Sequence, residues 1–423
     1  MTRWVDADSL KELLKPGMTV FVAGATAEPQ GILDSLSRNN KCCEGVRFVS
    51  VSIPGINSGE FASFSPKVSS TVFFATPQNR MNIESDNIDF IPMQYSTIFK
   101  YLQDDLPIDV ALVQLPPLQN DSVSLGLSAD FVPAILGKAK LVVAEINERQ
   151  PTPADSILAP LENIDLAIKC DRPVPVFAES KVDEVAQTIG VKVSELINDG
   201  DCLQIGIGGI PSAVLDALKQ KNDLGIHSGL ISDAVMHLAE SGNISGRYKT
   251  QDREKIVTGT TLGSQALIQW AGSYADLRIR PVSHTHDIGV LRSLDNFVSI
   301  NSAIEVDLFG QVSADMLGGR QWTGPGGAVD MMRGAGLSKG GRSIVALKAT
   351  ASAGKKSKIV SALDMNTAAT ALRTDVDYVV TEYGARHIRH LPVTERAKAL
   401  IELAAPEFRV QLSDEWQSMR TKT

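Results

Sequence analysis

No stretch of the chain approaches the roughly 20 consecutive apolar residues that a bilayer-spanning helix requires. The first residues, MTRWVDADSLKELL, carry acids where a secretory signal has an apolar core. The chain has only 4 cysteines, without the spaced CxxC pairs of a zinc site and too few for a secreted disulfide scaffold. We therefore expect a cytoplasmic protein whose cysteines are reduced, structural thiols: Cys42, Cys43, Cys170 and Cys202.

A strong charge of either sign is also missing. The formal net charge is -8 over 423 residues, which argues against nucleic acid or an anionic membrane surface as the main partner. The absence of low-complexity segments argues against a disordered interaction protein. Neither a GxSxG elbow nor a Walker loop is present, so two common α/β chemistries are not expected.

What the chain does contain is an alternation of short β-branched runs with amphipathic stretches. MTVFVAG, EPQGILDSLSR and VRFVSVSIPG follow one another within residues 18–55, an order typical of α/β proteins with mainly parallel strands. Several runs are apolar on both faces, so helices should cover the sheets. Further strands are predicted at 108–115, 140–147, 202–208, 343–347 and 377–384.

Two segments of the chain resemble each other. Residues 9–36 and 192–218 both predict a helix, a Gly turn, a strand, a Gly-containing loop, a proline and a second helix, which favours an internal duplication. The length suits two domains of about 200 residues. We expect two related open α/β domains, over 1–182 and 183–423, with the active site between them.

Glycine gathers in two loops. The first includes Ile207, Gly208 and Gly209 and opens a predicted helix, where free backbone N–H groups suit an anion or oxyanion. A plain strand-to-helix turn explains these residues equally well. The second loop includes Gly326 and Gly327. Lysines that follow it suit phosphates, although solvated loop lysines are more common: Lys339, Lys355, Lys356 and Lys358.

His284, His286 and Asp287 lie close together in sequence and have side chains that bind metals. A cluster of this kind without a spaced partner is a weak signal. We predict that the protein has no metal site.

Several motifs in order resemble one family over nearly the whole chain. They are LGLSADF and AKLVVAEINERQPTP in the first half, and INSAIEVDLFGQVSAD, GPGGAVD with SKGGRSIVAL, DVDYVVTEYGAR and PVTERAKALIELAAPEFR in the second. With these motifs the chain resembles the acetyl-CoA hydrolase/transferase family, which contains CoA-transferases acting on 4-hydroxybutyrate, butyrate and succinyl-CoA. The motifs are specific for the family and only weakly specific for the substrate.

The resemblance implies a ping-pong transfer of coenzyme A between carboxylic acids through a glutamyl-CoA thioester. CoA thioesters and small carboxylates are then the substrates, and no permanently bound cofactor, ATP or metal is needed. The resemblance assigns backbone groups at Ile207 and near Gly326 and Gly327 as oxyanion donors. It also implies a homodimer.

One motif departs from the family pattern. Well-studied members have a glutamate after a His-Ser/Thr pair, but here His227 and Ser228 are followed by Gly229, which cannot form an acyl-enzyme. If the halves are duplicated, Glu60 lies in the corresponding loop of the first half. The resemblance to a subset that includes itaconate CoA-transferases supports this position, and we predict Glu60 as the nucleophile rather than an exposed loop carboxylate.

Two other carboxylates are weaker candidates. Glu28 is ranked second, with capping of a helix over 28–38 as its simpler explanation. Glu305, in the strand-like run INSAIEVDL, is ranked third and interpreted as a buried or hinge carboxylate. Side chains that would line the cleft are those of Asn57, Ser58, His227 and Ser228; for His227 a structural role is at least as probable as acid/base work.

The acid that accepts CoA is open at this stage: succinyl-CoA or acetyl-CoA is the expected donor, and itaconate or 4-hydroxybutyrate the acceptor. A dicarboxylate needs a cation for its remote carboxyl group, for which Arg47, Arg80 and Arg320 are candidates. An acyl-CoA hydrolase is the first alternative and a CoA-binding protein without catalysis the second. A sugar-phosphate isomerase of similar topology is a distant fourth hypothesis.

Overall fold

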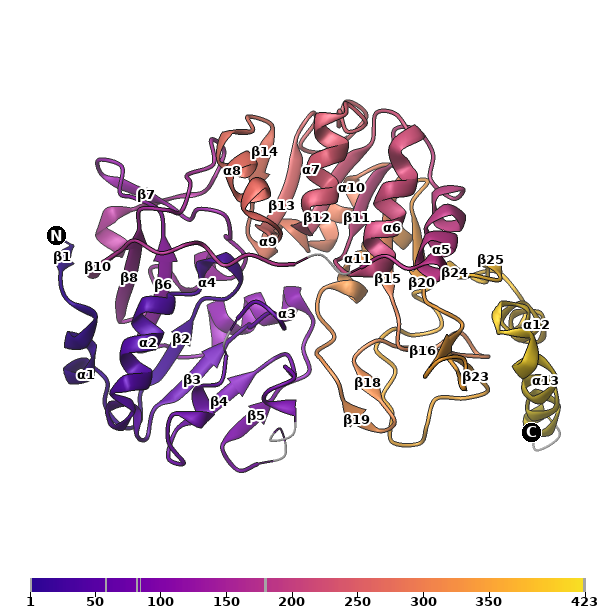
Figure 1. Ribbon diagram of the computed structural model, residues 1–423, viewed down its shortest axis with the longest axis horizontal. Helices are drawn as coiled ribbons and strands as arrows, with labels where there is room; N and C mark the ends of the chain where they lie inside the picture. The colour runs from indigo at the N-terminus through magenta and orange to yellow at the C-terminus, as the bar shows by residue number, and fades with distance from the viewer. Residues whose placement is uncertain (1, 58, 81–82, 84, 179–180, 421–423) are drawn as a thin grey trace. The chain divides into compact units, whose positions relative to one another are not determined.

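The structure is a computed structural model that describes residues 2–57, 59–80, 83, 85–178 and 181–420. The chain divides into two compact units, the first comprising Met1–Ala178 with Val257–Thr285 and the second Glu179–Ile256 with His286–Thr423. Figure 1 shows the elements of both units. The predicted boundary at 182/183 concerns the two halves of the sequence and stays a prediction.

The first unit is built on a parallel sheet in the order β1-β10-β8-β6-β2-β3-β4-β5. The central strands are short runs of Val, Leu, Ala and Phe that are buried on both faces, as in sheets covered by helices. The strands are β1 (Arg3–Trp4), β2 (Thr19–Val22), β3 (Arg47–Ser50), β4 (Ser69–Val72), β5 (Ile88–Phe90), β6 (Val110–Leu115), β8 (Leu141–Asn147) and β10 (Leu166–Cys170).

Helix α2 (Gln30–Arg38) covers one face of this sheet (Figure 1). Its buried residues Ile32, Leu33 and Leu36 belong to the same apolar cluster as Val22 and Phe48 of the strands. The remaining elements of the unit are α1 (Leu10–Leu13), α3 (Tyr95–Lys100), α4 (Val132–Ile135), the antiparallel pair β7 (Ser122–Ser124) and β9 (Leu158–Pro160), α8 (Gln265–Ser273), β14 (Leu277–Ile279) and α9 (Val282–Thr285). Strand β13 (Ile256–Thr261) begins in the second unit and continues here.

The second unit has a sheet in which β12, β11, β15, β20, β24 and β25 are neighbours in that order. All are parallel except β25, which returns antiparallel on β24. The strands are β11 (Cys202–Ile205), β12 (Gly225–Ile231), β15 (Phe297–Ser302), β20 (Arg342–Ala346), β24 (Tyr378–Thr381) and β25 (Gly384–His387), and the helices are α5 (Glu184–Ser194), α6 (Gly209–Ala217), α7 (Asp233–Glu240), α10 (Ile288–Ser293), α11 (Ala328–Leu337), α12 (Val393–Leu403) and α13 (Pro406–Arg420).

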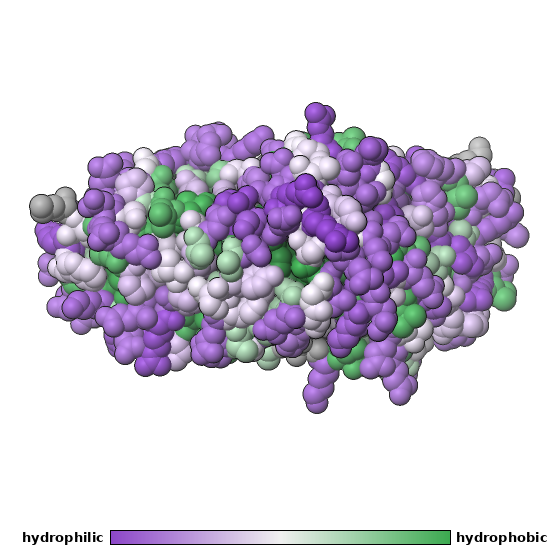
Figure 2. All heavy atoms as spheres, turned by 90° about the horizontal axis from the view of Figure 1, so that it is seen from above, coloured by the Kyte–Doolittle hydropathy of each residue, from purple (hydrophilic) through white to green (hydrophobic). Residues whose placement is uncertain are grey.

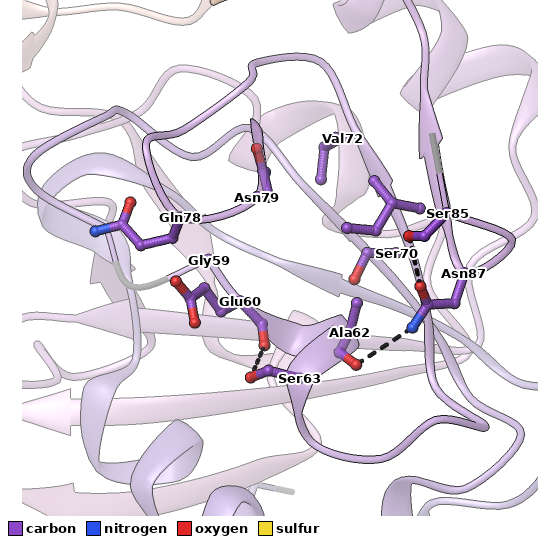
Figure 3. A pocket seen from close by; sticks show the side chains of 11 residues that line it. Gly59, Glu60, Ala62, Ser63, Ser70, Val72, Gln78, Asn79, Ser85 and Asn87 are labelled. Atoms are coloured by element: carbon purple, nitrogen blue, oxygen red, sulfur yellow. Dashed lines mark hydrogen bonds between the residues drawn. The ribbon is translucent and has the colours of Figure 1, made fainter. Parts of the chain in front are cut away.

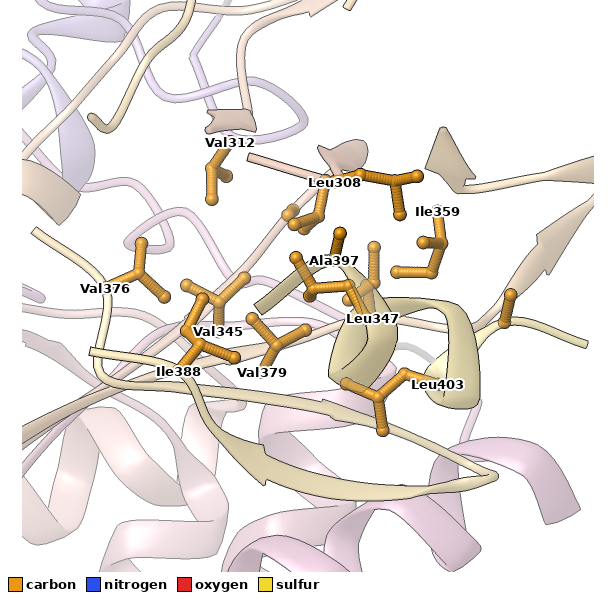
Figure 4. Close-up of a cluster of buried hydrophobic side chains, with 14 of the residues drawn as sticks. Leu308, Val312, Val345, Leu347, Ile359, Val376, Val379, Ile388, Ala397 and Leu403 are labelled. Atoms are coloured by element: carbon orange, nitrogen blue, oxygen red, sulfur yellow. The ribbon is translucent and has the colours of Figure 1, made fainter. Parts of the chain in front are cut away.

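The second unit also contains short strands that form small sheets separate from the main sheet. Strand β16 (Glu305–Asp307) pairs with β17 (Val312–Ser313) and β23 (Ile359–Val360). Two hairpins are formed by β18 (Met316–Leu317) with β19 (Arg320–Gln321) and by β21 (Thr350–Ala351) with β22 (Lys356–Ser357). Beneath them lies an apolar core in which Val345, Leu347 and Val379 of the sheet region meet Ala397 and Leu403 of α12 (Figure 4).

The two sheets share a strand order, which is what a duplicated chain predicts. Reading β3-β2-β6-β8-β10 beside β12-β11-β15-β20-β24 matches each strand by its place in the chain. The next strands at that edge differ, because β1 comes first in the chain and is parallel to β10, whereas β25 comes last and is antiparallel to β24. The predicted α/β fold with two related open sheets is confirmed. Predicted strands 108–115, 140–147 and 343–347 correspond to β6, β8 and β20 within two residues at each end.

Two predicted strands are shorter in the structure than in the sequence pattern. The run 202–208 ends at Ile205 because the glycines after it turn the chain into α6. The run 377–384 is a strand over Tyr378–Thr381, and the chain then reverses into β25.

The surface in Figure 2 is mainly hydrophilic, and its hydrophobic residues form small separate patches. Among the described residues, no helix has the length and apolar character needed to cross a membrane. All four cysteines are free, and burial raises the pKa of the thiols of Cys43, Cys170 and Cys202 to about 12, 12 and 11. These three thiols therefore stay protonated near neutral pH, as inert structural groups do.

Candidate active site

Glu60 lies at the end of the loop that follows β3, on the carboxyl side of the first unit's parallel strands. Asn57 ties this loop to the loop after β2. Its side-chain oxygen accepts hydrogen bonds from the N–H groups of Ala25 (2.9 Å) and Ile53 (2.8 Å), and its amide donates to the Ala25 carbonyl (3.0 Å). Asn57 is buried, so the structure gives this candidate a role in loop support. Ser58 lies outside the described residues.

The residues on either side of Glu60 fix its backbone. Gly59 has a φ of +39°, and a Cβ atom there would lie 2.7 Å from the hydroxyl of Ser52, so the close packing requires glycine. Phe61 is fully buried and its ring stacks on that of Phe48 with centroids 4.9 Å apart. Ser63 donates its hydroxyl to the Glu60 carbonyl at 2.6 Å. The Glu60 carboxylate is therefore presented from a supported turn.

A cavity of about 250 Å³ opens beside Glu60. Figure 3 shows the carboxylate on the side of Gln78, with Ser70, Ser85 and Asn87 across the cavity. The described residues that line it include no charged side chain besides Glu60 and combine polar with apolar groups: Gly59, Ala62, Ser63, Ser70, Val72, Gln78, Asn79, Ser85, Asn87 and Ile88. The arrangement offers a carboxylate and several hydrogen-bonding groups to a small molecule.

Glu28 has a different environment. It is buried, and α2 begins two residues later at Gln30 rather than at 28. The carboxylate at the amino end of α2 is that of Glu145, which accepts from the N–H groups of Gly31 (3.2 Å) and Ile32 (2.7 Å). Sequence reasoning missed Glu145, although an acid inside the apolar run of β8 was a visible signal.

Glu305 begins β16 and is half-buried. Burial, and then the nearby charge of Asp364, raise the pKa of its carboxyl group. The predicted single strand through this residue is two strands, because β15 ends at Ser302.

The first glycine loop of the second unit leaves room at the amino end of α6. Gly208 has a φ of +115°, and no atom of the described chain lies within 4 Å of a Cβ built on Gly206 or Gly208. Ile207 and Gly209 flank Gly208 at the start of this nine-residue helix. Free N–H groups and open space together suit an anion or oxyanion.

The second glycine loop leads into α11. Gly326 has a φ of +60°, and Gly327 is the N-cap residue of that helix. The second unit therefore has two helix amino ends at glycine loops.

His227, Ser228 and Gly229 lie inside β12, and His227 is buried with its ring edge-on to Phe297. Ser228 donates its hydroxyl to the Ile205 carbonyl at 3.1 Å. The proposed correspondence of this segment with residues 57–60 is wrong in detail, because Glu60 lies in the loop beyond β3 rather than inside the strand. Glu60 therefore stays a candidate because of its own loop and cavity.

The side chains of the His284 to Asp287 motif have separate surroundings. His286 is buried against Gly229 and Gly327, and burial lowers the pKa of its imidazole to about 3. Asp287 caps α10 by accepting a hydrogen bond from the N–H of Val290 at 2.9 Å. His284 lies within the short helix α9 (Val282–Thr285).

The candidate cations are distributed widely. Arg47 pairs with Asp89 on the surface at 3.0 Å, and Arg320 lies in the exposed hairpin strand β19. Arg80 follows the cavity residue Asn79, and burial lowers the pKa of its guanidinium.

The lysines that follow the second glycine loop also lie apart. Lys358 donates to the Ala303 carbonyl at 3.2 Å, and Lys339 faces Asp295 at 3.5 Å. Lys355 and Lys356 lie in the exposed β21–β22 hairpin.

Comparison with known proteins agrees with this geometry. Residues 2–178 match the acetyl-CoA hydrolase/transferase N-terminal domain and residues 263–416 the corresponding C-terminal domain. A 4-hydroxybutyrate coenzyme A transferase of Clostridium kluyveri is 35% identical over 417 residues, which cover 98% of this chain and 97% of that protein.

Two crystal structures are similar over nearly their whole length. RipA from Yersinia pestis has a TM-score of 0.93 at 26% identity and covers 99% of this chain and 98% of its own. A 4-hydroxybutyrate CoA-transferase from Porphyromonas gingivalis has a TM-score of 0.81 at 31% identity, covering 100% and 98%.

The two related open sheets define a duplicated α/β protein. The chain belongs to the acetyl-CoA hydrolase/transferase family. The predicted reaction class, transfer of CoA between an acyl-CoA and a carboxylate, is confirmed.

Proposed function

We propose that Glu60 is the nucleophile of a CoA-transferase that works through a glutamyl-CoA thioester. The observation that carries this proposal is the supported loop of Glu60, fixed by Asn57 and Phe61 and open to a cavity. The second unit offers no carboxylate after His227 and Ser228, because residue 229 is glycine. The predicted position of the site between the two halves stays a prediction.

The reaction follows from a carboxylate nucleophile. Glu60 attacks the thioester carbonyl carbon, and the carbon–sulfur bond breaks, so that CoA is expelled as a thiolate and a mixed acyl-glutamyl anhydride remains. The thiolate then attacks the glutamyl carbonyl, which releases the first acid as a carboxylate and leaves CoA on Glu60. A second carboxylate reverses these steps and carries CoA away. Each step exchanges one acyl bond for another, so no external energy source is required.

Each attack creates an oxyanion, and the glycine loops are the proposed donors. Backbone N–H groups around Ile207, Gly208 and Gly209 lie at the amino end of α6, and those of Gly326 and Gly327 at that of α11. Backbone donors of this kind need no reorganisation as charge develops, which is why they stabilise transition states. The thioester intermediate must also be kept from water.

The acceptor is proposed to be a small carboxylic acid, with acetyl-CoA or succinyl-CoA as donor. The cavity beside Glu60 suits such an acid, and its amide and hydroxyl groups suit a hydroxylated tail such as that of 4-hydroxybutyrate, the acid in two relatives' names. Itaconate is the dicarboxylate to compare with it, since its second carboxylate requires a cation, for which Arg80 is the residue nearest in sequence to the cavity.

Steady-state assays with and without acceptor test the reaction type. The purified protein, given acetyl-CoA or succinyl-CoA and a panel that includes 4-hydroxybutyrate and itaconate, should form a new thioester only when an acid is present. Glu60→Gln should lose at least about a thousandfold of this activity, because the amide cannot form the anhydride. Glu162→Gln, which changes an exposed acid in the same unit, is the matched control and should keep full activity.

The other hypotheses predict different results. Free CoA released at the same rate without any acceptor would establish a hydrolase. Binding of CoA without turnover for any acid would establish a protein that has lost catalysis. We also propose a homodimer, as the family resemblance implies, and a cytoplasmic location. Light scattering of the purified protein tests the first, and fractionation of its host cells tests the second.

A further inference from the structure

A histidine side chain lies between the glycines of two distant segments of the second unit. A Cβ atom built on Gly229 would lie 2.7 Å from Cε1 and 3.0 Å from Nε2 of His286. A Cβ atom on Gly327 would overlap Nε2 and Cδ2 of the same ring. The imidazole therefore occupies the space that any side chain at residue 229 or 327 would need.

Backbone conformation does not explain these two glycines. Gly327 has φ −94° and ψ 1°, and Gly229 lies within β12 without a left-handed φ. Other residue types adopt both conformations freely. The close approach of the His286 ring is the feature of the described structure that requires glycine at both positions.

The segment that carries the His286 ring is itself held in place by the packing of the helix that follows it, α10. His286 is 3% exposed, and the next residue, Asp287, caps α10. Helix α10 packs closely on α11, since a Cβ atom on Gly334 would lie 2.5 Å from Cβ of Leu291, and Leu291 shares a buried cluster with Met331 and Ala335. Burial lowers the pKa of His286 to about 3, so the ring is neutral at physiological pH.

We propose that His286 is a positioning residue for the transfer reaction: wedged between Gly229 and Gly327, its ring fixes the Gly326–Gly327 turn at the amino end of α11. This inference rests on the proposed function, which uses that turn as an oxyanion donor. The glycine at position 229 thus makes room for the imidazole, and the second unit supports the reaction through a neutral ring while the first supplies the carboxylate.

A double-mutant cycle tests the wedge without any substrate. Gly327→Ala should lower the midpoint of thermal unfolding, because its methyl group overlaps the ring, and His286→Ala should lower it by opening a cavity. The double variant should lose clearly less than the sum of the two, since the new methyl group enters the vacated space. Gly336→Ala, in the same helix with no close contact, is the control and should not couple to His286→Ala.

The positioning role is tested by the rate per folded molecule. With acetyl-CoA and an accepted acid, His286→Ala should lower kcat by between about tenfold and a hundredfold with a much smaller change in KM, as a misplaced donor group does. His286→Ala/Gly327→Ala should recover part of kcat. A structural role alone would reduce the folded fraction and leave kcat per folded molecule unchanged.

Additive effects on the unfolding midpoints would overturn the wedge, and an unchanged kcat in His286→Ala would overturn the positioning role. These failures are distinct from failure of the proposed function. If Glu60→Gln kept full activity while the cycle still showed coupling, the nucleophile assignment would fall and the packing of His286 would stand.

Discussion

Glu60 depends for its position on buried neighbours. Asn57 is the most informative of these, because one side chain satisfies three backbone groups from two loops. Its oxygen serves two N–H groups that the fold removes from water, and its amide serves one carbonyl. The side chain of Asn57, which was predicted from the sequence to line the cleft, thus holds the Glu60 loop in its conformation.

Replacement of Asn57 tests this dependence. Asn57→Ala leaves the buried N–H of Ala25 and the partly buried N–H of Ile53 without their acceptor and should cost about 1–3 kcal/mol of unfolding free energy. Activity should fall further than stability, because the loop that carries Glu60 loses its support. Asn57→Asp retains the acceptor oxygens and should lie between the two proteins in chemical denaturation and transfer assays. An Asn57→Ala variant with wild-type activity would contradict the argument.

Asp130 makes the stability of the protein depend on pH. Burial raises the pKa of its carboxyl group from 3.8 to about 7, against the opposing hydrogen bond from the Ser128 hydroxyl at 3.0 Å. The folded protein thus binds a proton that the unfolded chain releases above pH 3.8, so this contribution to stability is lost as the pH rises toward 7.

Asp130→Asn removes this titration. Between pH 5 and pH 8 the wild-type protein should lose on the order of 1–3 kcal/mol more unfolding free energy than the variant. Denaturant titrations at the two pH values measure the difference. Parallel curves for the two proteins would show that Asp130 has an ordinary pKa.

At the scale of elements, the two helices that follow the related strands β2 and β11 differ at their amino ends. The amino end of α2 is closed by the buried carboxylate of Glu145, whereas that of α6 lies at the open glycine loop. A carboxylate at a helix amino end satisfies free N–H groups and interacts favourably with the helix dipole. The first helix is thereby stabilised from within the protein, while in our proposal the N–H groups of the second bind an oxyanion of the substrate.

Glu145→Gln should destabilise α2 and with it the first unit. The amide offers one acceptor oxygen to two N–H groups, so we expect a loss of about 1–3 kcal/mol in unfolding free energy. The exposed neighbour Glu148 provides the control, because Glu148→Gln changes the same charge without a buried partner. Equal unfolding free energies for the two variants would contradict the assigned role of Glu145.

The elements themselves were largely predictable from local patterns. The apolar runs of β6, β8 and β20 are too short and too β-branched for helices, and Pro116 follows β6 directly. The glycine loops at α6 and α11 were also predictable, because glycines cluster in the sequence at both places. The end of β11 at Ile205 was not, because Ile207 continues the apolar pattern and only the φ of Gly208 shows where the chain turns.

At the scale of the whole molecule, the repeat in the sequence corresponds to a shared strand order in the two sheets. The alignment of the Glu60 segment with the segment 227–229, which the repeat suggested, does not hold in the structure. Sequence similarity aligned residues 57–60 with 227–230, but Asn57, Gly59 and Glu60 lie in a loop and residues 227–230 in a strand. Contacts between distant segments, such as those of His286 with Gly229 and Gly327, leave no local pattern. They require the fold to be known.

The central claim is that CoA becomes covalently attached to Glu60, and intact-mass measurement after incubation with succinyl-CoA tests it most directly. The wild-type protein without acceptor should gain the mass of CoA less water, on the peptide that contains Glu60, and should lose it when an accepted acid is added. Glu60→Gln should gain nothing while Glu162→Gln behaves as wild type. An adduct on another residue, or an undiminished adduct in Glu60→Gln, would contradict the account.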